Sequence, residues 1–264
     1  MPAVLAVFAH PDDIEFRAAG TLLLLREAGW DVHYWNICSG NLGSTVMKAR
    51  QTALVRRRES QTAAARLGAV WYPPFANDLE LFYTDANLRR VCAVVRRIQP
   101  SIVLTHPPID YMEDHTICCR LAVTGTFARG VPNYRSNPSG RPTREPLAVY
   151  HSAPHGLKGP LGEPYIPGCY VDIGAVHAKK RDSLSCHRSQ KEWLDASQGM
   201  DSYLVALDED ARVLGRASGK FHLSESWTRH LHLGFGGVDQ DPLREVLGPR
   251  CAGNRIGRAV KTLK

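Results

Sequence analysis

The sequence predicts an α/β fold: a mostly parallel sheet flanked by helices, built as a single domain with a C-terminal extension. One observation is that short apolar segments rich in β-branched residues alternate with longer helical segments. Such alternation is typical of strands joined by right-handed crossover helices. The other is that polar clusters directly follow two predicted strands, at residues 10–13 and 106–115. Because ligands bind at the carboxyl ends of strands in open α/β sheets, these clusters mark the functional edge.

Residues 4–8 form the first predicted strand, because the run Val-Leu-Ala-Val-Phe is short, apolar and partly β-branched. Gly29 and Gly68 each follow a predicted helix and are typical helix stops. Further strands are predicted at residues 32–38, 70–72, 101–105, 147–150 and 170–173, and helices at residues 17–28, 48–67, 87–98, 116–129 and 176–194. We expect residues 1–225 to form the main domain and residues 226–264 a C-terminal extension with a basic tail.

The composition is that of a globular protein and argues against several functional classes. The 264 residues carry a formal net charge of +7, yet they show neither a clustered basic face nor a known nucleic-acid-binding module. No apolar run approaches the roughly 20 residues of a membrane span, and the seven cysteines include no Cys-x-x-Cys pair. We therefore expect no nucleic-acid partner, no membrane insertion and a reducing, cytoplasmic location. Whether the chain forms a homo-oligomer is left open.

The first polar cluster is His10-Pro11-Asp12-Asp13, which follows the first strand. One imidazole and two carboxylates in four residues cost too much to bury unless they hold a metal ion or share protons. His10 and Asp13 are three residues apart on a tight loop and can hold one ion from two sides. The cluster therefore predicts a metal site that a second segment completes.

The second cluster follows the strand at 101–105 and contains Asp114 and His115 at the start of a predicted helix. His115 is a natural third ligand, and Asp114 is well placed to orient a neighbouring histidine. Zinc in hydrolases takes three protein ligands and leaves an open position for a water that is nucleophilic at neutral pH. The remaining carboxylate of the first cluster can serve as general base. Spacing alone does not choose between Asp12 and Asp13 for the metal.

These motifs resemble the LmbE-like/PIG-L family of zinc-dependent de-N-acetylases. The resemblance rests on Ala9-His10-Pro11-Asp12-Asp13 with Asp114-His115 about a hundred residues on, and it covers most of the chain. Softer similarities are Arg56-Arg57-Arg58-Glu59, Asp78, Asp172 and the stretch His187-Arg188-Ser189-Gln190. The resemblance implies a Rossmann-like fold and the hydrolysis of an N-acetyl or other N-acyl group on an amino sugar or related small-molecule glycoconjugate.

The resemblance also implies roles for individual residues. His10, Asp13 and His115 would bind Zn²⁺, and Asp12 would act as general base and then as acid to the leaving amine. Arg56 and Asp78 would contact sugar hydroxyls.

One position departs from the family pattern. Many members have His-x-Asp-His, with the first histidine stabilising the oxyanion, whereas this chain has Met112-Glu113-Asp114-His115. A thioether cannot donate that hydrogen bond. Zinc can polarise the carbonyl, and Tyr111, His106 and His187 are the candidate donors. We accordingly place Tyr111 and His187 with Arg56 and Asp78 as substrate-binding residues, and Asp114 with Asp12 as catalytic.

Three other functions fit parts of this pattern. Two histidines and a carboxylate also suit the facial triad of non-haem Fe(II) oxygenases, and His10-x-Asp12 has that spacing. Those enzymes usually need an antiparallel β-barrel, which the alternation of strands and helices disfavours. A non-catalytic sugar-binding relative is the second alternative, to which the change at Met112 points. A dinucleotide oxidoreductase is disfavoured because the sequence has no glycine-rich fingerprint.

Overall fold

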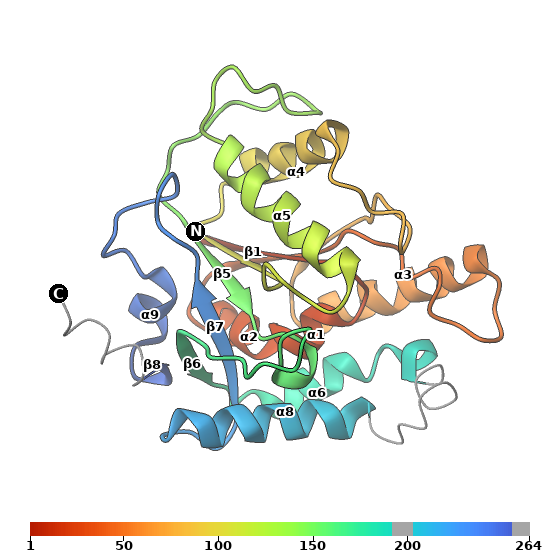
Figure 1. Ribbon diagram of the computed structural model, residues 1–264, viewed down its shortest axis with the longest axis vertical. Helices are drawn as coiled ribbons and strands as arrows, with labels where there is room; N and C mark the ends of the chain where they lie inside the picture. Colours follow the sequence, from red (N-terminus) through yellow and green to blue (C-terminus); the bar gives the residue numbers. More distant parts are fainter. Residues whose placement is uncertain (192–202, 255–264) are drawn as a thin grey trace.

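The computed structural model describes residues 1–191 and 203–254, and one mixed sheet forms its centre (Figure 1). The elements, in chain order, are β1 (Ala3–Phe8), α1 (Asp13–Arg17), α2 (Ala19–Glu27), β2 (Asp31–Asn36), α3 (Ala49–Arg66), β3 (Val70–Tyr72), α4 (Asp85–Ile98), β4 (Ile102–Thr105), α5 (Glu113–Ala128), β5 (Ala148–Ser152), η1 (His155–Leu157), β6 (Cys169–Asp172), α6 (His177–Leu184), α8 (Tyr203–Ser218), β7 (Ser224–Arg229), α9 (Pro242–Leu247), η2 (Gly248–Arg250) and β8 (Cys251–Gly253). The predicted α/β class is confirmed.

The sheet has the strand order β3-β2-β1-β4-β5-β7-β6-β8. Strands β3 to β5 in this order are parallel, whereas β7 pairs antiparallel with both β5 and β6, and β8 pairs antiparallel with β6. From β1 the chain winds first to β2 and β3 and then returns to the other side at β4. The gap between β1 and β4 is therefore the topological switch point, where α/β sheets bind ligands.

Both faces of the sheet are covered, and the side chains of β1 show how. Val4, Ala6 and Phe8 pack into the core under α2 and α8, whereas Leu5 and Val7 pack into the core under α4 and α5. Figure 1 shows the pair α4 and α5 on one side of the sheet and α2, α6 and α8 on the other. Because side chains on both faces of this strand are buried, its sequence is apolar at every position.

The chain differs from the sequence prediction near the first loop. One helix was expected at 17–28, but α1 begins at Asp13 and a break at Ala18, with φ −130°, separates it from α2. The predicted helix at 176–194 ends at Leu184, and its last residues, 192–194, lie outside the described residues.

The C-terminal region contributes to the same sheet. The predicted boundary between residues 225 and 226 falls inside β7, whose residues pair with β5 and β6. The basic tail lies outside the described residues from 255 onward. None of the described helices combines the length and the hydropathy that a membrane crossing requires.

Candidate active site

The loop after β1 is held in a strained conformation that turns its two carboxylates in different directions. Asp12 has φ 111°, in the region that side chains rarely adopt, and Asp13 opens α1 immediately afterwards. The backbone N–H of His10 donates to Asp13 Oδ2 at 2.7 Å, which fixes that carboxylate beside the imidazole. Strain of this kind costs about 1–3 kcal/mol and is typical of functional sites.

His10, Asp13 and His115 converge at the switch point. His10 Nδ1 lies 3.3 Å from His115 Nε2, and Asp13 Oδ2 lies 3.5 Å from each of these nitrogens. His115 reaches this place from the first turn of α5, because β4 runs parallel to β1 beside it. The structure therefore brings together the three residues predicted as metal ligands.

Two further carboxylates fix which nitrogen of each imidazole faces this centre. Asp114 Oδ2 lies 3.0 Å from His10 Nε2, and Asp110 Oδ1 lies 3.1 Å from His115 Nδ1. Burial opposes ionisation of both carboxyls, but their histidine partners lower the pKa of Asp114 and of Asp110, so both accept hydrogen bonds. The outer nitrogens donate, and the lone pairs of His10 Nδ1 and His115 Nε2 are directed inward.

The inner atoms fit a metal ion. Three lone-pair-bearing atoms that face one another repel unless a positive charge lies between them. Ligands bound tetrahedrally to zinc at about 2.0–2.1 Å lie roughly 3.3–3.4 Å apart, close to the separations of 3.3 and 3.5 Å found here. The site also attracts positive charge electrostatically. Although burial lowers it, hydrogen bonds to Asp114 and Asp13 raise the pKa of His10 to about 10, so that without an ion a proton occupies the inner nitrogen and metal binding would displace it.

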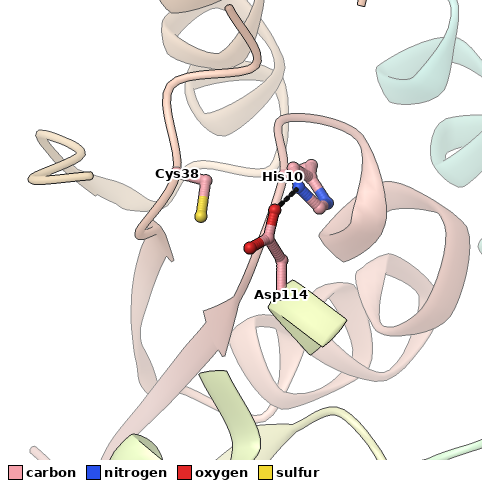
Figure 2. A group of neighbouring side chains, drawn as sticks. All are labelled: His10, Cys38 and Asp114. Atoms are coloured by element: carbon pink, nitrogen blue, oxygen red, sulfur yellow. Dashed lines mark hydrogen bonds and ion pairs between the residues drawn. The ribbon is translucent and has the colours of Figure 1, made fainter. Parts of the chain in front are cut away.

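Two neighbouring groups of potential ligands fit an ion less well. Figure 2 shows the Cys38 thiol near His10 and Asp114, where the dashed line joins only the last two. Burial and nearby carboxylates raise the pKa of Cys38 far above its usual range, so the thiol stays protonated and is a poor ligand. His106 Nε2 accepts from the Ala9 backbone N–H at 2.9 Å, so that its lone pair is already used.

Asp12 lies beside this centre and is held by other partners. Its Oδ2 accepts from the Tyr203 hydroxyl at 2.7 Å and lies 3.5 Å from Arg56 Nη2. Burial raises the pKa of Asp12, although the Arg56 charge acts in the opposite direction. A carboxylate with a raised pKa, close to the inner triangle but outside it, is suited to accept a proton.

These groups open into a cavity of about 440 Å³. It is lined by His10, Asp12, Asp13, Phe16, Leu42, Gly43, Arg56, Asp78, Leu79, Tyr111, Met112, Asp114, His115, His155, Gln190, Tyr203 and Ala206. One cavity at this edge of the sheet is therefore lined by the candidate metal site, the candidate base and apolar side chains.

The residues predicted to bind substrate take different positions. Arg56, Asp78 and Tyr111 line the cavity. Arg56 and Asp78 also form hydrogen bonds with the backbone of the loops around it. Arg56 donates to the carbonyl oxygens of Pro11 and Gly40, and Asp78 Oδ1 accepts from the Gly40 N–H at 2.7 Å.

His187 does not line the cavity. Its ring is fully buried, with Nε2 3.3 Å from Glu15 Oε2, and the Tyr34 hydroxyl donates to that same carboxylate oxygen at 3.2 Å. Because the ring is buried and lies outside the cavity lining, it is not positioned to contact a substrate there.

Three residues at the site were not predicted as members of it. Asp110 lies inside the second polar cluster, five positions before His115, and that spacing was its only sequence signal. Tyr203 and His155 had none, because each meets its partner through the tertiary fold: Tyr203 contacts a residue 191 positions earlier.

Comparison with known proteins agrees with this architecture. Residues 5–125 match the family described as PIG-L, GlcNAc-PI de-N-acetylase. The chain is 29% identical over 195 residues to the diacetylchitobiose deacetylase of Thermococcus kodakarensis, which covers 71% of this chain and 69% of that protein. It is 28% identical over 197 residues to the 4-oxalmesaconate hydratase of Pseudomonas putida, covering 72% and 74% of the two chains.

The fold has solved counterparts. The structure of the 4-carboxy-2-hydroxymuconate hydratase GalB of Pseudomonas putida superposes with a TM-score of 0.74 at 24% identity, covering 91% of this chain and 99% of that one. The fold and the histidine–carboxylate cluster define an α/β protein able to hold a metal ion at its switch point. The match of residues 5–125 to the PIG-L family agrees with the resemblance that the motifs at residues 9–13 and 114–115 predicted.

Proposed function

We propose that this protein is a zinc-dependent N-deacetylase whose substrate is a small N-acylated amino sugar or glycoconjugate. The description of the matching family and the name of the Thermococcus relative support the reaction. Two histidines and one carboxylate are a donor set that zinc accepts in hydrolytic sites. A bound zinc ion would polarise the substrate carbonyl and lower the pKa of a water molecule.

Asp12 is the proposed general base. In the reaction an amide and water give an amine and a carboxylic acid: the water oxygen bonds to the carbonyl carbon and the C–N bond breaks. Asp12 takes the proton of the water and passes it to the leaving nitrogen. Among the described residues, the contacts from Tyr203 and Arg56 both fall on Oδ2, which leaves Oδ1 to receive the proton.

The observation that carries this proposal is the separation of the two adjacent carboxylates. Asp13 lies in the triangle with His10 and His115, while Asp12 is held outside it. Asp114 supports the reaction indirectly, because it fixes the ring of His10.

The walls of the cavity provide the proposed substrate contacts. Arg56, Asp78 and Tyr111 remain the candidates, since each lines the cavity. His187 is reassigned to a supporting role behind the loop, in contact with Glu15. A cytoplasmic location stays a prediction from the cysteine content.

Metal analysis and a substrate panel test the proposal. The purified chain should hold about one zinc ion, and it should release acetate from N-acetylglucosamine or N,N'-diacetylchitobiose. Iron in place of zinc would favour the oxygenase alternative. Hydration of an unsaturated tricarboxylate without acetate release would favour the activity named for the Pseudomonas relative. Binding of sugars without turnover would indicate a non-catalytic relative.

The variant Asp12→Asn tests the role of the general base separately from metal binding. We expect it to keep zinc and to lose roughly 10²–10⁴-fold in kcat, as general-base removal does. The matched control is Asp182→Asn, at an exposed aspartate on α6, and it should behave as the unsubstituted protein. Full activity in Asp12→Asn would rule out the assigned base.

A further inference from the structure

His155 is an exposed residue of η1 at the mouth of the cavity, and a buried arginine fixes its tautomer. Arg17 Nη2 lies 2.8 Å from His155 Nδ1, and Arg17 Nη1 donates to Asp210 Oδ2 at 2.9 Å. A guanidinium carries only donors, so Nδ1 of His155 must accept and the ring proton must sit on Nε2. The result is a neutral N–H donor on a residue that lines the cavity.

The cavity has few other uncommitted donors among its described residues. Both Nη groups of Arg56 donate to backbone carbonyls, and the Tyr203 hydroxyl donates to Asp12. Gln190 lies with Arg56 around Gly43, on the side of the base. Only Tyr111 and His155 are left on the side of His115, while Met112 places a thioether in the same wall.

We propose that His155 is a catalytic residue of this site. Its Nε2–H donates a hydrogen bond to the carbonyl oxygen of the scissile amide as negative charge develops there. Arg17 and Asp210 are positioning residues that hold the ring in this tautomer. The inference rests on the proposed deacetylation. It names the group that donates a hydrogen bond to the carbonyl oxygen of the amide in that reaction.

Ring contacts connect His155 to the candidate ligand His115 through Tyr111. The Tyr111 ring lies edge-on to His115, with centroids 5.7 Å apart, and its centroid is 6.2 Å from that of His155. The Phe16 ring, at 5.2 Å, supports His155 from α1. The positive charge of Arg17 next to Nδ1 disfavours a second proton on the ring and so favours its neutral form.

His155 is preferred over Tyr111 because its orientation is set in advance. Arg17 is buried and bonded to both Asp210 and His155, whereas no described hydrogen bond fixes the hydroxyl of Tyr111. Donors that need no reorganisation during the reaction stabilise charge best. His155 keeps its proton throughout: it stabilises the oxyanion, while the proton of the water travels through Asp12 to the amine.

Kinetics of the zinc-loaded full chain test the proposal, with N,N'-diacetylchitobiose and N-acetylglucosamine as probes. Removing one oxyanion donor should lower kcat by about 10²–10³-fold, so His155→Ala should show that loss with little change in KM and unchanged zinc content. His155→Gln, which retains an N–H donor, should recover part of it. The control is His222→Ala, at an exposed histidine before β7, and it should match the unsubstituted protein.

A second readout needs no activity. Nitrogen-15 NMR of the histidine rings in the metal-free chain should show His155 with a bare Nδ1 and a protonated Nε2. The variant Arg17→Met should lose this pattern, because nothing then holds Nδ1 as the acceptor.

The outcomes separate the inference from the proposed function. If the unsubstituted chain releases no acetate, the proposed function fails and the inference fails with it. If it releases acetate and His155→Ala keeps kcat within about threefold, or Tyr111→Phe alone shows the large loss, only the inference is overturned. A protonated Nδ1 on His155 in the unsubstituted chain would also overturn it.

Discussion

Asp110 is bonded to His115 at 3.1 Å, and its side chain is 1% exposed. A carboxylate on the outer nitrogen of a ligating histidine fixes the ring and increases its basicity. The variant Asp110→Asn should therefore weaken zinc binding by about 10- to 100-fold while the fold is retained. Competition with a chelator measures this, with Asp182→Asn as control. Equal affinity in both variants would contradict the proposed support of His115 by the Asp110 carboxylate.

Met112 offers a complementary test at the same scale. It lines the cavity at the start of α5, where many family members have a histidine. If this position and His155 serve the same oxygen, Met112→His should restore activity to His155→Ala by about tenfold or more. In the unsubstituted background the gain should be much smaller. No gain in the double variant would show that the two positions address different atoms.

At the scale of elements, α2 begins without a capping side chain of its own. The amide groups of Gly20 and Thr21 donate instead to Glu225 on β7, at 2.7 and 2.8 Å, and Lys180 Nζ on α6 lies 2.7 Å from the same carboxylate. This buried group joins three elements far apart in sequence. It explains how strands late in the chain hold a helix next to the active-site loop.

Lys180→Met should consequently destabilise the protein strongly. Both Lys180 and Glu225 are almost fully buried, and removing one partner of a buried ion pair costs about 3–5 kcal/mol. Urea unfolding measures the free energy, with Lys179→Met, at an exposed neighbour on the same helix, as control. A loss below about 1 kcal/mol, the size typical of a surface pair, would contradict the assigned burial.

Elements with local signals were the ones that the sequence predicted well. The strand at residues 4–8 and the helices that stop at Gly29 and Gly68 carry their periodicity and their ends in neighbouring residues. The break at Ala18 was missed because the loop geometry at Asp12 and Asp13 starts a separate short helix. Such a break depends on long-range constraints that periodicity does not record.

For the whole molecule, the resemblance to the PIG-L family and the α/β class followed from two motifs on adjacent strands. These motifs come from parts of the chain about a hundred residues apart, and the parallel pairing of β1 with β4 brings them together. The contributions of Tyr203, Asp210 and His155 could not be predicted, because their partners lie 138 to 193 residues away and leave no pattern. The C-terminal third was least predictable for the same reason.

The C-terminal third also provides the last prediction. A chain ending at residue 225 would lose most of β7, which lies between β5 and β6, together with the fully buried Trp227. Without this strand the edge of β5 is unpaired and β6 has no bond to the rest of the sheet, so cooperative unfolding should be lost. A chain ending at residue 254 keeps every described strand and should melt within about 5 °C of the full chain. Circular dichroism and tryptophan fluorescence during heating compare the two. A cooperative transition in the shorter chain would instead support a separate domain at residues 1–225.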